Sequence, residues 1–170
     1  ADCGLAFDGD ADRLIAVDAS GQVVDGDRLI YICAKALKEK RILKDHMVTA
    51  TVMSNMGFYK AMEKIGCKVD TTQVGDRYVL ERMLQTGCVI GGEQSGHIIF
   101  LNHTTTGDGI LSGLQLMQAL RDMKTTLAEA GAEVNIYPQV LKNAKVKNEN
   151  KKTYMNDEIV RKEIEGLEKK

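Results

Sequence analysis

The feature that most constrains the fold of this 170-residue chain is the alternation of short apolar runs with longer segments of helical periodicity. The runs at 47–52, 67–74 and 88–90 have the length of buried strands. The segments between strands are roughly 10 to 16 residues long and carry apolar side chains at helical spacing. This alternation predicts α/β layers around a mixed or parallel sheet, and the length allows one ordinary domain with a sizeable core.

The same patterns predict the other elements. Further strands are expected at 3–7, 14–17, 97–101 and 139–146, with a turn at 19–22. Helices are expected at 25–40, from Ser54 as N-cap to 65, at 76–87, from Asp108 as N-cap onward, and at 157–170. The last of these is highly charged, with Glu158/Lys162 and Glu165/Lys169 at favourable i, i+4 spacing.

Composition excludes several classes of partner. The 23 basic and 24 acidic side chains leave a net charge of −1, which gives no electrostatic reason to bind nucleic acid or a membrane surface. No apolar run reaches the roughly 20 residues of a membrane span, and no signal-peptide pattern opens the sequence. The four cysteines form no CxxC pair, so we expect buried reduced thiols and a cytoplasmic location.

The strongest candidate site is the acidic loop Asp8-Gly9-Asp10-Ala11-Asp12-Arg13. Aspartates at i, i+2 and i+4 can converge on one cation, and oxygen ligands alone suit Mg²⁺ before Ca²⁺ or Mn²⁺. An EF-hand is excluded, because Arg13 stands where that loop needs glycine and Ala19 where it needs glutamate. The alternative is a solvated acidic turn, but three crowded carboxylates call for a counter-ion, so we predict a metal site. Arg13 is placed to hold a phosphate oxygen.

A second candidate is the segment 91–97, GGEQSGH. Its glycines allow the backbone to approach a ligand closely, and Glu93 is a natural acceptor for paired sugar hydroxyls. Ser95 adds a hydroxyl and His97 a titratable ring. A glycine-rich turn with a surface glutamate explains the motif equally well. A nucleophile elbow is excluded, because Glu93 stands where that motif needs glycine.

Two weaker loops, VGDR at 74–77 and TTTGDG at 104–109, each place a glycine and an aspartate before a predicted helix. Helix N-termini bind phosphates, although neither loop has the lysine of a P-loop. Taken singly, each is explained by helix capping alone.

Taken together and in this order, the four loops resemble the α-D-phosphohexomutase superfamily. The resemblance runs through DGDADR, residues 51–59, VGDRYV, GGEQSGH and TTGDG, and it covers nearly the whole chain. VGDRYV favours the bacterial branch that acts on glucosamine phosphate. Two alternatives stay open: a piece of a phosphomannomutase/phosphoglucomutase, and a non-catalytic module that binds Mg²⁺ or a sugar phosphate.

The resemblance implies an isomerase that interconverts glucosamine 6-phosphate and glucosamine 1-phosphate through a phosphoserine and a bisphosphate intermediate. It places the enzyme in amino sugar metabolism, where it supplies peptidoglycan precursors. It implies that Asp8, Asp10 and Asp12 hold Mg²⁺ and that Arg13 steadies the transferred phosphoryl group. Sugar-binding roles are implied for Glu93, Ser95, Asp76 and Arg77, with His97 as a sugar contact or proton-transfer group.

The resemblance also implies a three-layer α/β/α domain with a mixed sheet, flanked by parts of neighbouring domains. Residues 1–18 would end a metal-binding domain 2, 19–123 would form the sugar-binding domain 3, and 124–170 would begin a phosphate-binding domain 4. No serine lies in a TASHN-type phosphoserine loop, and nothing resembles the RxSGTEP phosphate loop. We therefore expect this chain to be inactive without the missing domains of its parent, for which a homodimer is expected.

Overall fold

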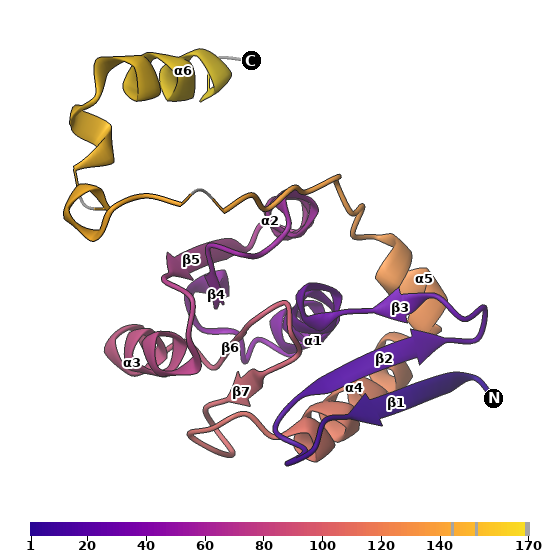
Figure 1. The fold of residues 1–170 in the computed structure, drawn as a ribbon. Helices are drawn as coiled ribbons and strands as arrows, with labels where there is room; N and C mark the ends of the chain where they lie inside the picture. Colours follow the sequence, from indigo (N-terminus) through magenta and orange to yellow (C-terminus); the bar gives the residue numbers. More distant parts are fainter. Residues whose placement is uncertain (144, 152, 169–170) are drawn as a thin grey trace. The chain divides into compact units, whose positions relative to one another are not determined.

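The computed structural model describes residues 1–143, 145–151 and 153–168, in two compact units, Ala1–Pro138 and Gln139–Lys170 (Figure 1). The first unit contains the strands of the described residues and helices α1 to α5, and the second contains α6 (Glu158–Glu168). Short 3₁₀ turns occupy Lys44–His46, Asn148–Asn150 and Tyr154–Asn156. No helix in the described ranges is both long and apolar enough to cross a membrane. The domain boundaries expected at 18/19 and 123/124 stay predictions.

The central sheet of the first unit has the strand order β5-β4-β6-β7. Its strands are β4 (Met47–Thr51), β5 (Lys68–Thr72), β6 (Ile90–Gly92) and β7 (Ile98–Phe100). β4 runs parallel to β5 and β6, which are reached through helices, whereas β7 pairs antiparallel with β6 after a tight turn. The predicted mixed sheet is therefore confirmed.

Helices α1 (Gly26–Glu39) and α2 (Met56–Lys64) cover one face of this sheet. Alternate side chains of β4, Val48 and Ala50, are buried in the same cluster as Phe58 of α2. Successive strand side chains point to opposite faces, so Thr49, between Val48 and Ala50, must face another layer.

That other layer is α3 (Asp76–Thr86), which lies on the opposite side of the sheet (Figure 1). Its buried side chains Val79 and Met83 form a separate small cluster with Ile99 of β7. The predicted three-layer α/β/α arrangement is confirmed.

A second, antiparallel sheet comes from the N-terminal segment, in the order β1-β2-β3. Its strands are β1 (Cys3–Phe7), β2 (Leu14–Asp18) and β3 (Val23–Val24), and the last follows the predicted turn at 19–22. Helix α4 (Gly109–Met123) contacts β1 and β2 on one side and α1 on the other. The loop between β1 and β2 thereby lies beside the start of α4.

Helices α2 and α4 begin near their predicted N-cap residues, and the N-cap of α2 is shifted by one residue. Asp108 caps α4, because its carboxylate accepts the hydrogen bond of the Leu111 amide. Asn55 rather than Ser54 caps α2, because the Asn55 side chain accepts the hydrogen bond of the Gly57 amide.

Two predictions for the second half of the chain need correction. The sequence pattern did not reveal α5 (Leu127–Ala132), which a capping box between Thr126 and Glu129 begins. The strand predicted at 139–146 is wrong for its described residues, which form no strand. Val140 and Leu141 are 76% and 70% exposed, and a strand needs a partner for its backbone groups.

In α6 the predicted ion pair between Glu158 and Lys162 is present, whereas Lys169 of the second predicted pair lies outside the described residues.

The four cysteines are free thiols, as predicted. Cys33, Cys67 and Cys88 are buried, and Cys3 is partly exposed. Burial raises the pKa of Cys33 to about 12, so this side chain behaves as a small apolar group.

Candidate functional site

The acidic loop is the connection between β1 and β2. One carboxylate oxygen each of Asp8, Asp10 and Asp12 lies within 4.8 Å of the others, which is close enough to share a cation. Oδ1 of Asp12 is buried and accepts no hydrogen bond from the described residues. Arg13 Nε lies 3.5 Å from this oxygen, but a single arginine leaves the three carboxylates with an excess of negative charge, so the three side chains fit a hard cation.

Arg13 is held against this loop through its first side-chain nitrogen. Its Nε lies 2.6 Å from Asp8 Oδ2 and 3.5 Å from Asp12 Oδ1. Desolvation raises the pKa of Asp8, but the hydrogen bonds and charge of Arg13 outweigh it and hold that pKa below its ordinary value. The arginine is half-exposed, and its terminal nitrogens make no hydrogen bond among the described residues, so they can reach a ligand.

His97 connects the acidic loop to the 104–109 loop. Its Nδ1 lies 3.0 Å from Asp12 Oδ2, and its Nε2 lies 3.1 Å from the backbone nitrogen of Gly107. Only 6% of the residue is exposed. Three of the four predicted loops therefore meet at this side chain.

Glycines allow these loops to approach one another. A Cβ on Gly96 would lie 2.1 Å from the carbonyl oxygen of Leu14, and one on Gly109 would lie 2.6 Å from that of Arg13. The Gly109 amide also donates to the Ala11 carbonyl at 2.9 Å. The sequence suggested close approach to a ligand, but at these positions the glycines serve contacts between loops.

Glu93 connects the GGEQSGH turn to the fourth loop. Its Oε1 accepts the hydrogen bond of the Gly75 amide at 3.0 Å, at the N-cap of α3. The backbone of Gly26 holds the same turn, because its amide donates to the Gln94 carbonyl at 2.9 Å. A Cβ at position 26 would lie 2.0 Å from the Glu93 carbonyl oxygen.

The remaining predicted site residues are more exposed. Ser95 lies on the surface of the turn between β6 and β7. Asp76 begins α3 but does not cap it, since its carboxylate accepts only the adjacent Arg77 amide among the described residues. Arg77 is paired with Glu81 on the surface of α3, at 2.8 Å. The structure thus joins Asp8, Asp12, Arg13, Glu93 and His97 into one framework, and Ser95, Asp76 and Arg77 lie outside it.

Sequence reasoning missed the backbone donors that join the loops. The Gly75 amide donates to Glu93 and the Gly107 amide donates to His97. In the sequence, the glycine itself is the only sign of either donor. The buried aspartate of α1, Asp27, was missed as well; its Oδ2 accepts the Asn55 amide at 2.7 Å. A carboxylate in the first turn of an apolar helix was its only signal.

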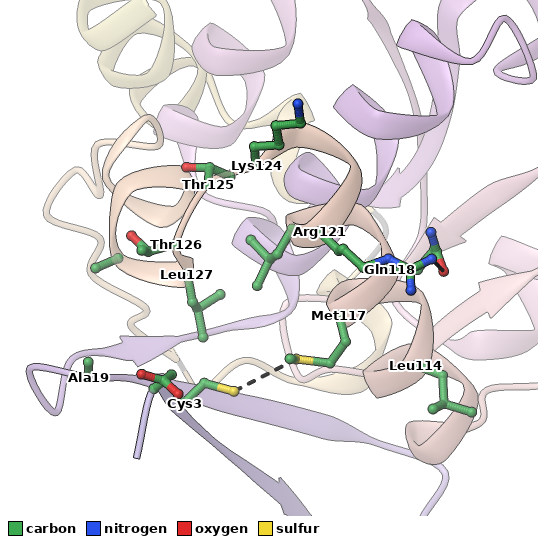
Figure 2. A pocket seen from close by; sticks show the side chains of 13 residues that line it. Cys3, Ala19, Leu114, Met117, Gln118, Arg121, Lys124, Thr125, Thr126 and Leu127 are labelled. Carbon is green, nitrogen blue, oxygen red and sulfur yellow. Dashed lines mark hydrogen bonds between the residues drawn. The ribbon is translucent and has the colours of Figure 1, made fainter.

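An apolar hollow lies apart from these loops, along the C-terminal half of α4 (Figure 2). Leu114, Met117 and Leu127 line it, and the Cys3 sulfur lies 3.8 Å from that of Met117. It contains neither the acidic triad nor the Glu93 turn, so we place the candidate site at the four loops.

Comparison with known proteins identifies the family of the chain. Residues 25–137 match the family model of the phosphoglucomutase/phosphomannomutase α/β/α domain III. The chain is 56% identical over its full length to "Phosphoglucosamine mutase" of Alkaliphilus metalliredigens (strain QYMF), and it spans 38% of that protein.

Solved structures show the same fold. A phosphoglucomutase/phosphomannomutase family protein from Burkholderia thailandensis superimposes with a TM-score of 0.70 at 26% identity, over 79% of this chain and 29% of that one. An N-acetylglucosamine-phosphate mutase of the α-D-phosphohexomutase superfamily, 22% identical, gives 0.65 over 79% and 39%. The chain belongs to the phosphoglucomutase/phosphomannomutase family, and it includes that family's α/β/α domain III.

Proposed function

We propose that this chain is the metal- and sugar-binding part of a phosphoglucosamine mutase, which interconverts glucosamine 6-phosphate and glucosamine 1-phosphate. The observation that carries the proposal is the joining of the four loops by the Asp12–His97–Gly107 and Glu93–Gly75 hydrogen bonds. The 56% identity to the Alkaliphilus mutase favours glucosamine phosphate over other hexose phosphates.

The acidic loop would hold Mg²⁺ through Asp8, Asp10 and Asp12. Their clustered oxygens support this assignment, and Oδ1 of Asp12 accepts no hydrogen bond from the described residues. When bound, Mg²⁺ neutralises negative charge on the oxygens of the transferred phosphoryl group. Arg13 would contribute to the same task, because Asp8 occupies its Nε and leaves two terminal nitrogens for phosphoryl oxygens.

The GGEQSGH turn would bind the sugar. Gly75 fixes one oxygen of Glu93, which leaves the other to accept hydrogen bonds from sugar hydroxyls. Ser95 would add a hydroxyl on the same turn, and Asp76 and Arg77 would close on the substrate from the start of α3. A sugar contact for His97 remains a prediction from the resemblance.

The expected domain limits assign metal binding and sugar binding to different domains. We propose that 1–18 completes a metal-binding domain, 19–123 forms the sugar-binding domain and 124–170 leads into a phosphate-binding domain. The phosphoserine donor would come from another part of the same polypeptide. A cytoplasmic homodimer that supplies peptidoglycan precursors completes the proposal.

The test is the activity of the longer protein that contains this chain, followed by phosphorus NMR with glucosamine 6-phosphate, glucose 6-phosphate or mannose 6-phosphate. We expect conversion of the glucosamine compound to be fastest. Glu93→Gln should lower kcat/KM by about a hundredfold, a typical cost of losing a substrate-orienting group. The exposed Glu39→Gln is the control and should leave it unchanged.

Other outcomes would redirect the assignment. Faster conversion of mannose or glucose phosphate would identify a phosphomannomutase/phosphoglucomutase. Binding of sugar phosphate without turnover by the longer protein would identify a non-catalytic module.

A further inference from the structure

The segment 51–59 contributes to the family resemblance but has no task in the proposed site. Within it, Asn55 is 2% exposed and lies between β4 and α2. The Asn55 backbone amide donates to Asp27 Oδ2 of α1 at 2.7 Å, and its side-chain oxygen accepts the Gly57 amide at 2.9 Å. Two helices therefore fix the position of this side chain.

The same side chain also contacts a residue 82 positions away in the sequence. Its oxygen accepts the Tyr137 amide at 2.9 Å, and its nitrogen donates to the Tyr137 carbonyl oxygen at 2.8 Å. An extended backbone normally needs a neighbouring strand to satisfy both of these groups. Here a single buried amide side chain satisfies them, because it carries a donor and an acceptor side by side.

Tyr137 ends a segment that we call the exit segment, residues 133–137, which joins α5 to the second unit. The exit segment forms neither helix nor strand, but it is closely packed. A Cβ on Gly57 would overlap the Asn135 carbonyl oxygen, and Val134 is only 1% exposed. The exit segment is therefore held against the first unit as far as its last residue.

The first turn of α1 connects Asn55 to the turn that carries Glu93. Asp27 accepts the Asn55 amide, and the amide of the preceding residue, Gly26, donates to the Gln94 carbonyl at 2.9 Å. Gln94 directly follows Glu93 in the sequence. A short series of hydrogen bonds thus sets the position of the exit segment relative to the proposed sugar ligand.

We propose that Asn55 is a positioning residue, which fixes the point where the chain leaves the first unit relative to the Glu93 turn. The proposal deepens the proposed function and rests on it, since it assigns a phosphate-binding domain to the polypeptide that follows Tyr137. That domain and Glu93 must hold opposite parts of one substrate, so the start of the domain needs a fixed place. The 51–59 motif thereby acquires a task that needs no contact with the substrate.

The test separates the two tasks of the Asn55 side chain. In Asn55→Asp the cap of α2 is kept, because aspartate is as good an N-cap as asparagine. A carboxylate has no N–H, however, so an oxygen would face the Tyr137 carbonyl oxygen where the structure has a hydrogen bond.

Asn55→Ser is a second variant that adds no charge. Its hydroxyl can cap α2, but one hydroxyl cannot occupy the places of both the amide oxygen and the amide nitrogen. The matched control is Asn102→Asp, which makes the same chemical change at an exposed position.

The first measurement is the exchange of backbone amides with deuterium in the full 170-residue chain, followed by NMR. We expect the Tyr137 amide to exchange about tenfold faster in both Asn55 variants, relative to the amides of α2, because local opening of the exit segment then breaks fewer bonds. Asn102→Asp should leave this ratio unchanged.

The second measurement is the steady-state kinetics of the longer protein that contains this chain, with glucosamine 6-phosphate. Both Asn55 variants should raise KM about three- to tenfold and lower kcat by less than about threefold, because a misplaced second contact weakens substrate binding in general. Asn102→Asp should leave both constants unchanged.

Three results would overturn the positioning role. They are an unchanged Tyr137 exchange ratio in both variants, an equal acceleration throughout α2, which would assign Asn55 to folding alone, and an unchanged KM in an active longer protein. If the Tyr137 amide exchanged faster as expected but the longer protein converted no hexose phosphate, the proposed function would fail while the attachment of the exit segment by Asn55 would stand.

Discussion

Replacing Asp27 by asparagine is expected to stabilise the protein near neutral pH and to change its stability little in acid. Asp27 is fully buried in the first turn of α1, and its Oδ1 has no hydrogen-bond partner in the described residues. Burial raises the pKa of Asp27 from 3.8 to about 6, although the Asn55 amide and the Ser54 hydroxyl oppose this rise.

The size of the effect follows from that rise. A pKa difference of roughly two units corresponds to about 3 kcal/mol of tighter proton binding by the folded state. This contribution to stability is fully present below the unfolded pKa of 3.8 and is lost as pH rises through about 6. Asparagine has no proton to lose, and it keeps an oxygen that can accept the Asn55 amide.

The assay is urea unfolding followed by far-ultraviolet circular dichroism at several pH values between about 4 and 8, a range that spans the Asp27 transition. The quantity to plot is the free energy of unfolding of Asp27→Asn minus that of the unaltered protein. This difference should rise by up to about 3 kcal/mol as pH increases. Glu39→Gln, at an exposed position, should give a flat difference. A flat or falling difference for Asp27→Asn would refute the reasoning.

Two further predictions concern the core and the turn that carries Glu93. Gly26→Ala should lower the free energy of unfolding by about 2 kcal/mol or more, since its Cβ would lie 2.0 Å from the Glu93 carbonyl oxygen; unchanged stability in urea would contradict this. Thiol labelling of the folded protein should modify Cys3 before Cys33, Cys67 and Cys88, because these three thiols are buried and burial raises their pKa values. Rapid labelling of Cys33 without unfolding, detected by mass spectrometry, would count against the burial.

The layered fold was predictable because β4, β5 and β7 are each followed by a segment whose apolar residues recur at helical spacing. Short or unpaired elements were harder to predict from the sequence. β3 is only two residues long, and the only sequence signal for α5 is the capping box at Thr126. The apolar residues at 139–146 look like a strand in sequence, but strand formation depends on a partner, which a local pattern does not contain.

The candidate site was predictable in its residues and not in its connections. Aspartates at alternate positions of the acidic loop predict a cation site from their chemistry alone. The bond between His97 and Asp12 joins residues 85 positions apart, and that between Gly75 and Glu93 joins residues 18 apart. Such pairs depend on how the β1–β2 and β6–β7 connections are placed by the sheets, and no local spacing encodes that.

The measurement that tests the joined site most directly is the effect of bound Mn²⁺ on the NMR signals of the 170-residue chain. Mn²⁺ broadens the signals of nearby amides, so residues 8–13, Ser95 and Gly107 should lose intensity together. Ala128 should keep its signal, because it follows the far end of α4, a 15-residue helix about 22 Å long that starts at the acidic loop. Broadening confined to 8–13, or equally strong at Ala128, would contradict a single site built from these loops.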